Sequence, residues 1–297
     1  MARPERTLVT IPISHFCEKA RWALDRAGIE YTERRHIQII HQLAAKRARG
    51  GKTVPVLTTP EGVFGQSRGI LVYADIQLPE PQRLYPGDDA LCGEVLALEA
   101  RFDSILGVEG RRWLYHEVFK DPKPLTPFNL TGVPGWERRI FPFVLQPAKV
   151  YINRYLDIDE ATVAQALRRV DKELDFVGEL LSDGRRYLVG DRFTAADLAF
   201  AALSAPLTVP LQYGTPLPQP EDLPERMAER VRARRAPGRA VCVAHVRRAP
   251  RNGRHRARTS GVRQERVLAI APAPQHGAHT RTNEDRSSRP ADTFYEA

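Results

Sequence analysis

The sequence predicts an α/β N-terminal domain over residues 5–80, an all-α helical bundle over 88–233 and a disordered basic tail over 234–297. Short apolar and β-branched segments alternate with helical patterns in the first region, whereas only helical patterns occur in the second. Periodicity disappears from about residue 234. With 297 residues, 42% of them apolar, the chain is long enough for two modest cores.

The N-terminal region is predicted to follow the order βαβα and then ββα. Gly28 follows the first helical pattern, where a residue with left-handed backbone geometry would end the helix. A turn signal at 59–62 separates two later strands, and Ser67 is expected to cap the helix after them. The predicted elements are strand 8–11, a helix ending at 27, strand 31–37, helix 42–48, strands 53–57 and 63–65, and helix 67–74.

Proline and glycine residues over 79–89 place a domain boundary near residue 82. One helix is predicted over 89–119 and another over 136–156, where Pro147 should produce a kink. Apolar residues then recur at spacings of four and three between 163 and 181, which is typical of an amphipathic helix. Thr194 and Asp197 are spaced as a capping box for a further helix.

The net charge of +9 comes entirely from the tail. Residues 234–297 carry 14 arginines, no lysine and five acidic residues, whereas 1–233 carry 31 basic and 31 acidic residues. A nucleic-acid partner is not expected, because the tail has no aromatic residue before position 294 and no repeated Arg-Gly-Gly pattern. A shifted reading frame in GC-rich coding DNA would also produce this composition, and we interpret the tail in that way.

The three cysteines, Cys17, Cys92 and Cys242, are widely spaced and form no CxxC motif. Reduced thiols in the cytoplasm are the simplest interpretation, and no metal site is expected. The N-terminus lacks the apolar core of a signal peptide, and no window approaches the roughly 18 apolar residues that a membrane span requires. We therefore expect a cytoplasmic protein with no membrane partner.

The run Ser14-His15-Phe16-Cys17 opens the first helical pattern directly after an apolar strand. A helix start presents unpaired backbone N–H groups and the positive end of the helix dipole. A thiolate held there, from the protein or from a ligand, is stabilised over the neutral thiol. The motif therefore indicates thiol chemistry.

Four motifs together resemble the cytosolic glutathione transferases, in a bacterial form with a serine and a cysteine in the first motif. The resemblance implies a thioredoxin-like N-terminal domain, an all-α second domain, and a homodimer that transfers the thiol of glutathione to a small electrophile, as in detoxification. Glutathione would be the co-substrate. The motifs are 14–24 (SHFCEKARWAL), 53–57 (TVPVL), 65–71 (GQSRGIL) and 187–191 (YLVGD).

The resemblance also implies roles for individual residues. Val54 would pair its main chain with the cysteinyl unit of glutathione, beside a cis bond to Pro55. Gln66 and Ser67 would hold the γ-glutamyl end, since a helix start binds anions. A basic residue in the segment before Pro55, Lys52 in preference to Lys46, would hold the glycine carboxylate.

Ser14 corresponds to the catalytic serine of several classes of the family, and its hydroxyl would favour the thiolate of bound glutathione; alternatively it only caps the helix. Cys17 is either a small packing residue or a thiolate able to form a mixed disulfide, which would make the protein a glutathione-dependent oxidoreductase. His15 could tune either sulfur, but exposure to solvent is the simpler expectation. A binding module without activity is the third alternative.

The electrophile pocket is expected between the two domains, because the thiol of glutathione would face the second domain there. Phe16 should form one wall of this pocket. Candidates on the first long helix are Glu109, Arg112, Trp113 and His116, with a buried core position as the alternative for the tryptophan.

Overall fold

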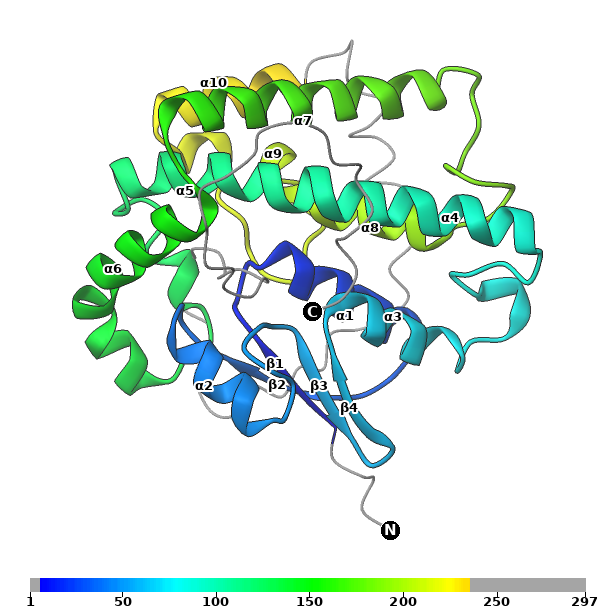
Figure 1. Cartoon of the computed structure of the whole chain (residues 1–297), viewed down its shortest axis with the longest axis horizontal. Coiled ribbons are helices and arrows are strands. Elements are labelled where there is room, and N and C mark those ends of the chain that lie inside the picture. The colour runs from blue at the N-terminus through cyan, green and yellow to red at the C-terminus, as the bar shows by residue number, and fades with distance from the viewer. Residues whose placement is uncertain (1–5, 236–297) are drawn as a thin grey trace, which may run out of the picture.

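A computed structural model describes residues 6–235, in which a four-stranded sheet packs against helices and is followed by an all-helical domain (Figure 1). The predicted fold class is confirmed. Cys242 and residues 236–297 of the tail expected from residue 234 lie outside the described residues. The N-terminal elements are β1 (Thr7–Thr10), α1 (His15–Arg26), β2 (Thr32–Arg35), α2 (Ile40–Arg47), β3 (Val56–Thr59), β4 (Gly62–Gly65) and α3 (Ser67–Asp75).

The sheet has the strand order β2-β1-β3-β4, in which β1 pairs parallel with β2 and antiparallel with β3, and β3 pairs antiparallel with β4. Side chains alternate between its faces. Leu8 and Leu57 belong to the large core that includes residues of α1 and α3. Val9 and Val56 instead pack with Ala45 of α2, so helices cover both faces.

The second domain is built almost entirely from helices. The predicted helix over 89–119 forms, but a π-helical segment, Asp103–Glu109, interrupts its α-helical geometry. The last helix reaches Arg235, so the first two residues of the predicted tail, 234 and 235, are helical. The helices are α4 (Asp89–Phe102), α5 (Gly110–Lys120), α6 (Gly135–Leu156), α7 (Glu160–Leu180), α8 (Ala195–Leu203), α9 (Ala205–Thr208) and α10 (Glu225–Arg235).

Of the two caps expected from the sequence, one forms and one does not. The Asp197 carboxylate accepts the N–H of Thr194 at 2.7 Å and that of Leu188 at 2.9 Å, which confirms the capping box of α8. The expectation that Ser67 caps α3 is wrong. Gln66 occupies the cap position, and Ser67 is the first residue of the helix.

Charged side chains join the two domains. Lys19 of α1 is fully buried and donates to Glu99 at 3.0 Å and to Asp103 at 2.7 Å. Glu137 of α6 accepts the N–H of Ile37 at 2.8 Å and contacts the His36 ring at 2.6 Å. These contacts hold α1 and the segment after β2 against the second domain.

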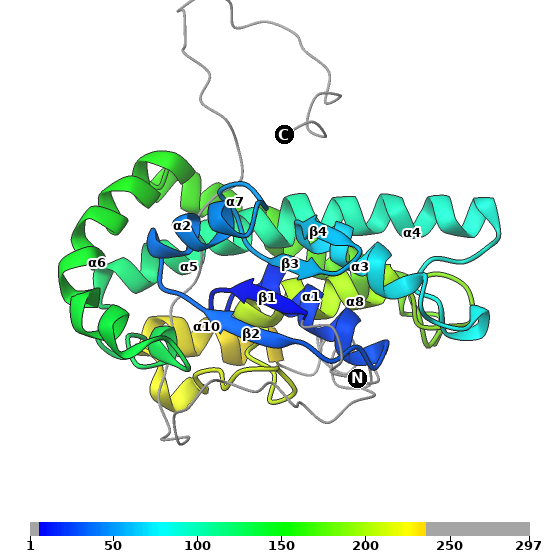
Figure 2. The same ribbon diagram turned by 90° about the horizontal axis from the view of Figure 1, so that it is seen from below.

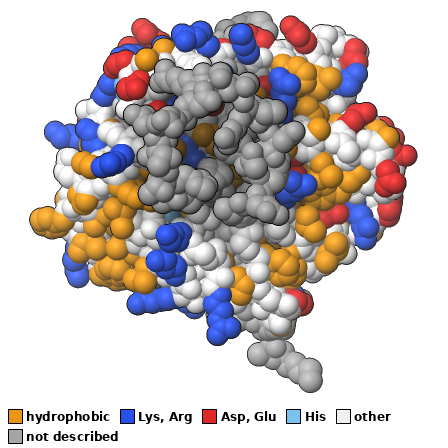
Figure 3. Space-filling model, in the orientation of Figure 1, with side chains coloured by type: hydrophobic (Ala, Val, Ile, Leu, Met, Phe, Trp, Pro, Cys, Tyr) orange, Lys and Arg blue, Asp and Glu red, His pale blue; other side chains and the backbone are white. Residues whose placement is uncertain are grey.

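Helix α6 has an unusual outer face. Trp136, Phe143 and Val150 lie seven residues apart on it and are exposed, Phe143 by 81%. The space-filling view shows apolar side chains gathered over this helix at the left of the molecule (Figure 3). Pro142 and Pro147 lie inside α6, which follows an arc in Figure 2, as expected where prolines remove backbone hydrogen bonds. No helix within 6–235 is long and apolar enough to cross a membrane.

Candidate functional site

The start of α1, the loop before β3 and the start of α3 meet at one edge of the sheet. The register aligns Val9 with Val56 and Val56 with Gly65 across two antiparallel pairings. The chain that leaves β1 therefore runs beside the chain that enters β3 and the chain that leaves β4. This topology brings Ser14, Val54–Pro55 and Gln66–Ser67 to the same edge.

Ser14 is the N-cap of α1. Its side-chain oxygen accepts the N–H of Cys17 at 3.2 Å, and the whole residue is buried. The capping role considered for Ser14 is therefore present. A hydroxyl that accepts one hydrogen bond still has a proton to donate, so capping is compatible with binding a thiolate.

Cys17 lies one helical turn further along and is fully buried. Its side chain packs with Val54 and Ile11, which connects the first helix to the proline loop. Burial raises the pKa of the Cys17 thiol, although the Arg21 charge and a hydrogen bond from Ser14 oppose this. Burial and a raised pKa favour the packing role over the reactive thiolate for Cys17.

The Val54–Pro55 peptide bond is cis. Val54 is buried, and within residues 6–235 neither its N–H nor its C=O takes part in a backbone hydrogen bond. A donor and an acceptor are thus left for an extended peptide that runs beside this loop. Lys52 lies exposed two residues earlier.

Gln66 has a φ of 60° and a ψ of 152°, a backbone geometry that residues with a Cβ rarely adopt. Such strain is typical of functional sites. Ser67, which is 4% exposed, begins the nine-residue helix α3, whose first N–H groups have no partner within the helix. These donors can bind a carboxylate.

His15 is fully buried, so the expectation that it faces solvent is wrong. Its Nε2 lies 3.0 Å from the carbonyl oxygen of Gly107, in the π-helical segment of the second domain. Burial lowers the pKa of His15 to about 3, so the ring is neutral and Nε2 donates this hydrogen bond. Beside it, Phe16 packs so closely on Gly107 that a Cβ there would meet its ring.

The four candidates for the electrophile pocket lie elsewhere on α5 or just before it. Glu109 pairs with Arg112 and with Arg169 of α7, and Arg112 also donates to the carbonyl of Leu156 at 2.8 Å. Trp113 is fully buried under the Arg234 guanidinium, and His116 contacts Glu117 and Glu160. These contacts join α5 to α6, α7 and α10 and do not bring the four residues to Ser14.

A segment some 200 residues away holds the loop that carries Ser14. The Tyr213 hydroxyl donates to the carbonyl of Ile13 at 3.1 Å, and the Thr215 hydroxyl donates to that of Pro12 at 3.3 Å. The N–H of Gly214 donates to the buried Glu18 carboxylate at 2.9 Å. The sequence does not predict these contacts, because no local pattern relates positions so far apart.

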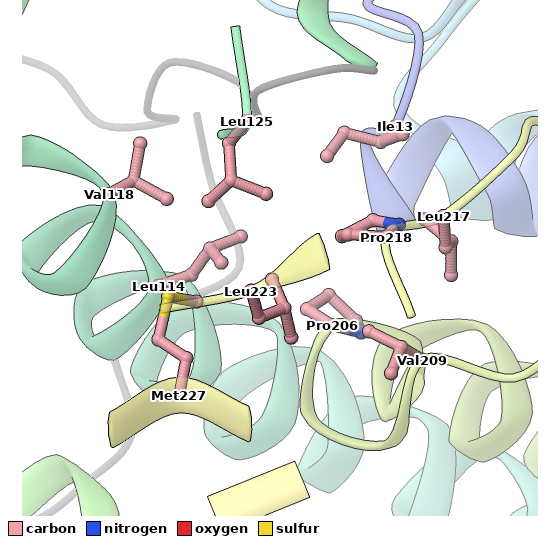
Figure 4. A pocket seen from close by; sticks show the side chains of 10 residues that line it. All are labelled: Ile13, Leu114, Val118, Leu125, Pro206, Val209, Leu217, Pro218, Leu223 and Met227. Carbon is pink, nitrogen blue, oxygen red and sulfur yellow. The ribbon is translucent and has the colours of Figure 1, made fainter. Parts of the chain in front are cut away.

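An apolar cavity of about 30 Å³ lies behind the same loop. Leu114 and Val118 of α5 form one side of it and Ile13 the other, with Met227 of α10 below (Figure 4). For comparison, a cavity of about 150 Å³ holds benzene. The cavity is therefore too small for an aromatic electrophile and instead seats the Ile13 side chain.

Two family models match the chain. Residues 8–82 match the glutathione S-transferase N-terminal domain, and residues 139–217 match the corresponding C-terminal domain. No curated protein matches the chain.

Solved structures of glutathione S-transferases are similar to the chain. The protein from Xanthobacter autotrophicus Py2 is 18% identical with a TM-score of 0.53, over 83% of this chain and 95% of that one. The protein from Methylobacillus flagellatus KT, solved with glutathione bound, is 17% identical with a TM-score of 0.49, over 80% and 98% of the two chains. At such identities the likeness is one of fold. On the two domain models, the chain belongs to the glutathione S-transferase superfamily.

Proposed function

We propose that the protein is a glutathione transferase that activates the thiol of glutathione for attack on a small electrophile. The supporting observation is the convergence of Ser14, the Val54 main chain and the start of α3 at one sheet edge. Glutathione would pair its cysteinyl unit with Val54, place its γ-glutamyl end at Gln66–Ser67 and direct its glycine carboxylate to Lys52.

Ser14 would then donate its hydroxyl proton in a hydrogen bond to the sulfur. A hydrogen bond to the charged form lowers the pKa of a thiol, and it is stronger in a buried site than in water. The thiolate attacks the electrophilic carbon, a C–S bond forms, and a leaving group such as chloride departs with the bonding electron pair. The thiol proton passes to solvent.

The test uses the full chain, glutathione and the neutral aryl halide 1-chloro-2,4-dinitrobenzene. Ser14→Ala should raise the pKa of the bound thiol, which is measured from the ultraviolet absorbance of the thiolate. It should also lower kcat by about 100-fold, within the range for proton-transfer catalysis. Cys17→Ser and the surface control Ser182→Ala should leave this pKa and kcat unchanged. Unfolding curves would separate these effects from the loss of the cap, which costs about 1 kcal/mol.

Two outcomes would favour the other functions. Disulfide exchange with glutathione that disappears in Cys17→Ser, without conjugation in the parent chain, would indicate an oxidoreductase. Failure of the parent chain to bind immobilised glutathione would indicate a module without activity. We also propose a homodimer in the cytoplasm, as the family suggests; light scattering on the purified chain would measure its mass.

A further inference from the structure

Arg111, in the first turn of α5, is a buried guanidinium without a charged partner among residues 6–235. It is 5% exposed, and its Nε has no hydrogen-bond partner. No ion pair joins it to a carboxylate within residues 6–235. Burial, the largest effect, lowers the pKa of Arg111, and among the described residues Tyr115 and Tyr155 raise it.

The other buried arginines of the described chain differ in this respect. Arg21 and Arg35 both donate to Glu33, at 2.7 and 2.8 Å, and Arg234 contacts Asp171 at 3.3 Å. A buried cation destabilises the folded chain unless an anion compensates its lost hydration. The fold meets this requirement for Arg21, Arg35 and Arg234 but not for Arg111.

The position of Arg111 indicates which molecule would supply the anion. Its guanidinium carbon lies 5.9 Å from the centre of the Phe16 ring, and Phe16 is two residues from Ser14. The groups proposed to hold the carboxylates of glutathione, Lys52 and the start of α3, belong to the N-terminal domain. Arg111 instead belongs to the second domain and reaches the start of α1 at the Phe16 ring, and the electrophile would lie against that domain.

We propose that Arg111 binds the carboxylate of the electrophile, so that the preferred substrates are aromatic electrophiles that carry a carboxylate. This inference rests on the proposed transferase function. The planar guanidinium can donate two parallel hydrogen bonds to a carboxylate. Phe16 and Tyr155, which lie near Arg111, supply aromatic surface for the rest of the molecule.

The test compares 4-chloro-3,5-dinitrobenzoate with its neutral carboxamide, using the full chain and glutathione. In both, sulfur displaces chloride, which leaves with the bonding pair, and the thiol proton goes to buffer. After correction for uncatalysed rates, kcat/KM should favour the benzoate. Arg111→Met should reduce this preference by about 10- to 100-fold, as expected when charge-assisted hydrogen bonds are lost in a desolvated site.

Arg232→Met is the control, because it removes a charge on α10 that pairs with the exposed Glu225. It should leave the preference unchanged. Should Arg111→Met fail to fold, Arg111→Gln replaces it with the same expected reduction. The proposal is wrong if the parent chain shows no preference, or if either Arg111 variant retains the preference and raises the KM for glutathione instead.

Calorimetry separates this proposal from the transferase function. Tighter binding of the benzoate than of the carboxamide, lost in Arg111→Met, would support the anion site even in a chain that does not conjugate. Conjugation of both probes without a difference in affinity would support the transferase and overturn the anion site.

Discussion

The regions around Arg21 and Arg111 bury a guanidinium each, but only one of them supplies its counter-charge. Near the start of α1, Arg21 donates to Glu33 and Glu18, and the same Glu33 accepts hydrogen bonds from Arg35 and Thr10. At the start of α5, Arg111 lies near an aromatic ring and pairs with no carboxylate among residues 6–235. The first arrangement is complete within the described residues, whereas we propose that a bound anion completes the second.

This difference distinguishes a structural charge from a binding charge. Removing one partner of a complete buried pair leaves the other uncompensated, which is strongly destabilising. Removing a buried cation that has no partner relieves that cost instead. We therefore expect Glu33 and Arg111 variants to change stability in opposite directions.

The largest effect is expected at Glu33. Glu33→Gln should lower the free energy of unfolding by about 3–5 kcal/mol, since Arg21 would remain buried without its ion pair. Denaturant unfolding measures this change. Asp183→Asn, which breaks the exposed pair with Arg185, is the control and should have no measurable effect. Equal losses of stability in Glu33→Gln and Asp183→Asn would contradict the view that the buried ion pair matters more than the exposed one.

The pH dependence of the free energy of unfolding tests the same Glu33 carboxylate. Burial raises the pKa of Glu33, but the Arg21 and Arg35 charges more than offset this, and the result is about 2 against 4.5 in the unfolded chain. Ionised Glu33 therefore contributes its full stability above pH 4.5 and loses it as the pH falls toward 2, by about 1.4 kcal/mol per pH unit. The difference in unfolding free energy between parent and Glu33→Gln should shrink over that range. A difference that stays constant would contradict the pairing.

A smaller effect is expected where Phe16 of α1 packs on Gly107. Gly107→Ala should cost about 1–3 kcal/mol, because its Cβ would overlap the Phe16 ring. Gly93→Ala in α4 is the matched control. Nothing lies within 4 Å of a Cβ there, so alanine should stabilise the helix by up to about 1 kcal/mol. Thermal unfolding of both variants gives the comparison. If Gly107→Ala does not change the stability, the Phe16 ring can move away from the added Cβ.

The smallest change in stability is expected for Tyr213→Phe, which removes one hydrogen bond to the Ser14 loop and costs about 1 kcal/mol. If the loop positions Ser14, kcat should also fall several-fold while the KM for glutathione stays the same. Thr208→Val removes a buried hydroxyl bonded to a carbonyl elsewhere in the domain. It should cost similar stability and leave kcat unaltered; a matching loss of kcat would argue against a positioning role for Tyr213.

Local sequence patterns determined the domain order, most helices and the motifs of the sheet edge. The reason is that periodicity, Gly28 and the Thr194–Asp197 box act through neighbours in the chain. The cap at Ser67 was predicted one residue too late, because the choice between adjacent polar residues depends on how β4 turns into α3.

Tertiary packing decided which polar residues are buried and which have partners. In the sequence, Arg111 and Arg112 are adjacent arginines, yet Arg112 bonds the carbonyl of Leu156 and Arg111 faces Phe16, because neighbours on a helix point about 100° apart. His15 is buried for a similar reason: Gly107 approaches it from the other domain. Contacts between distant segments leave no local pattern, so only the folded structure identified Arg111 and the Tyr213 contact with the Ser14 loop.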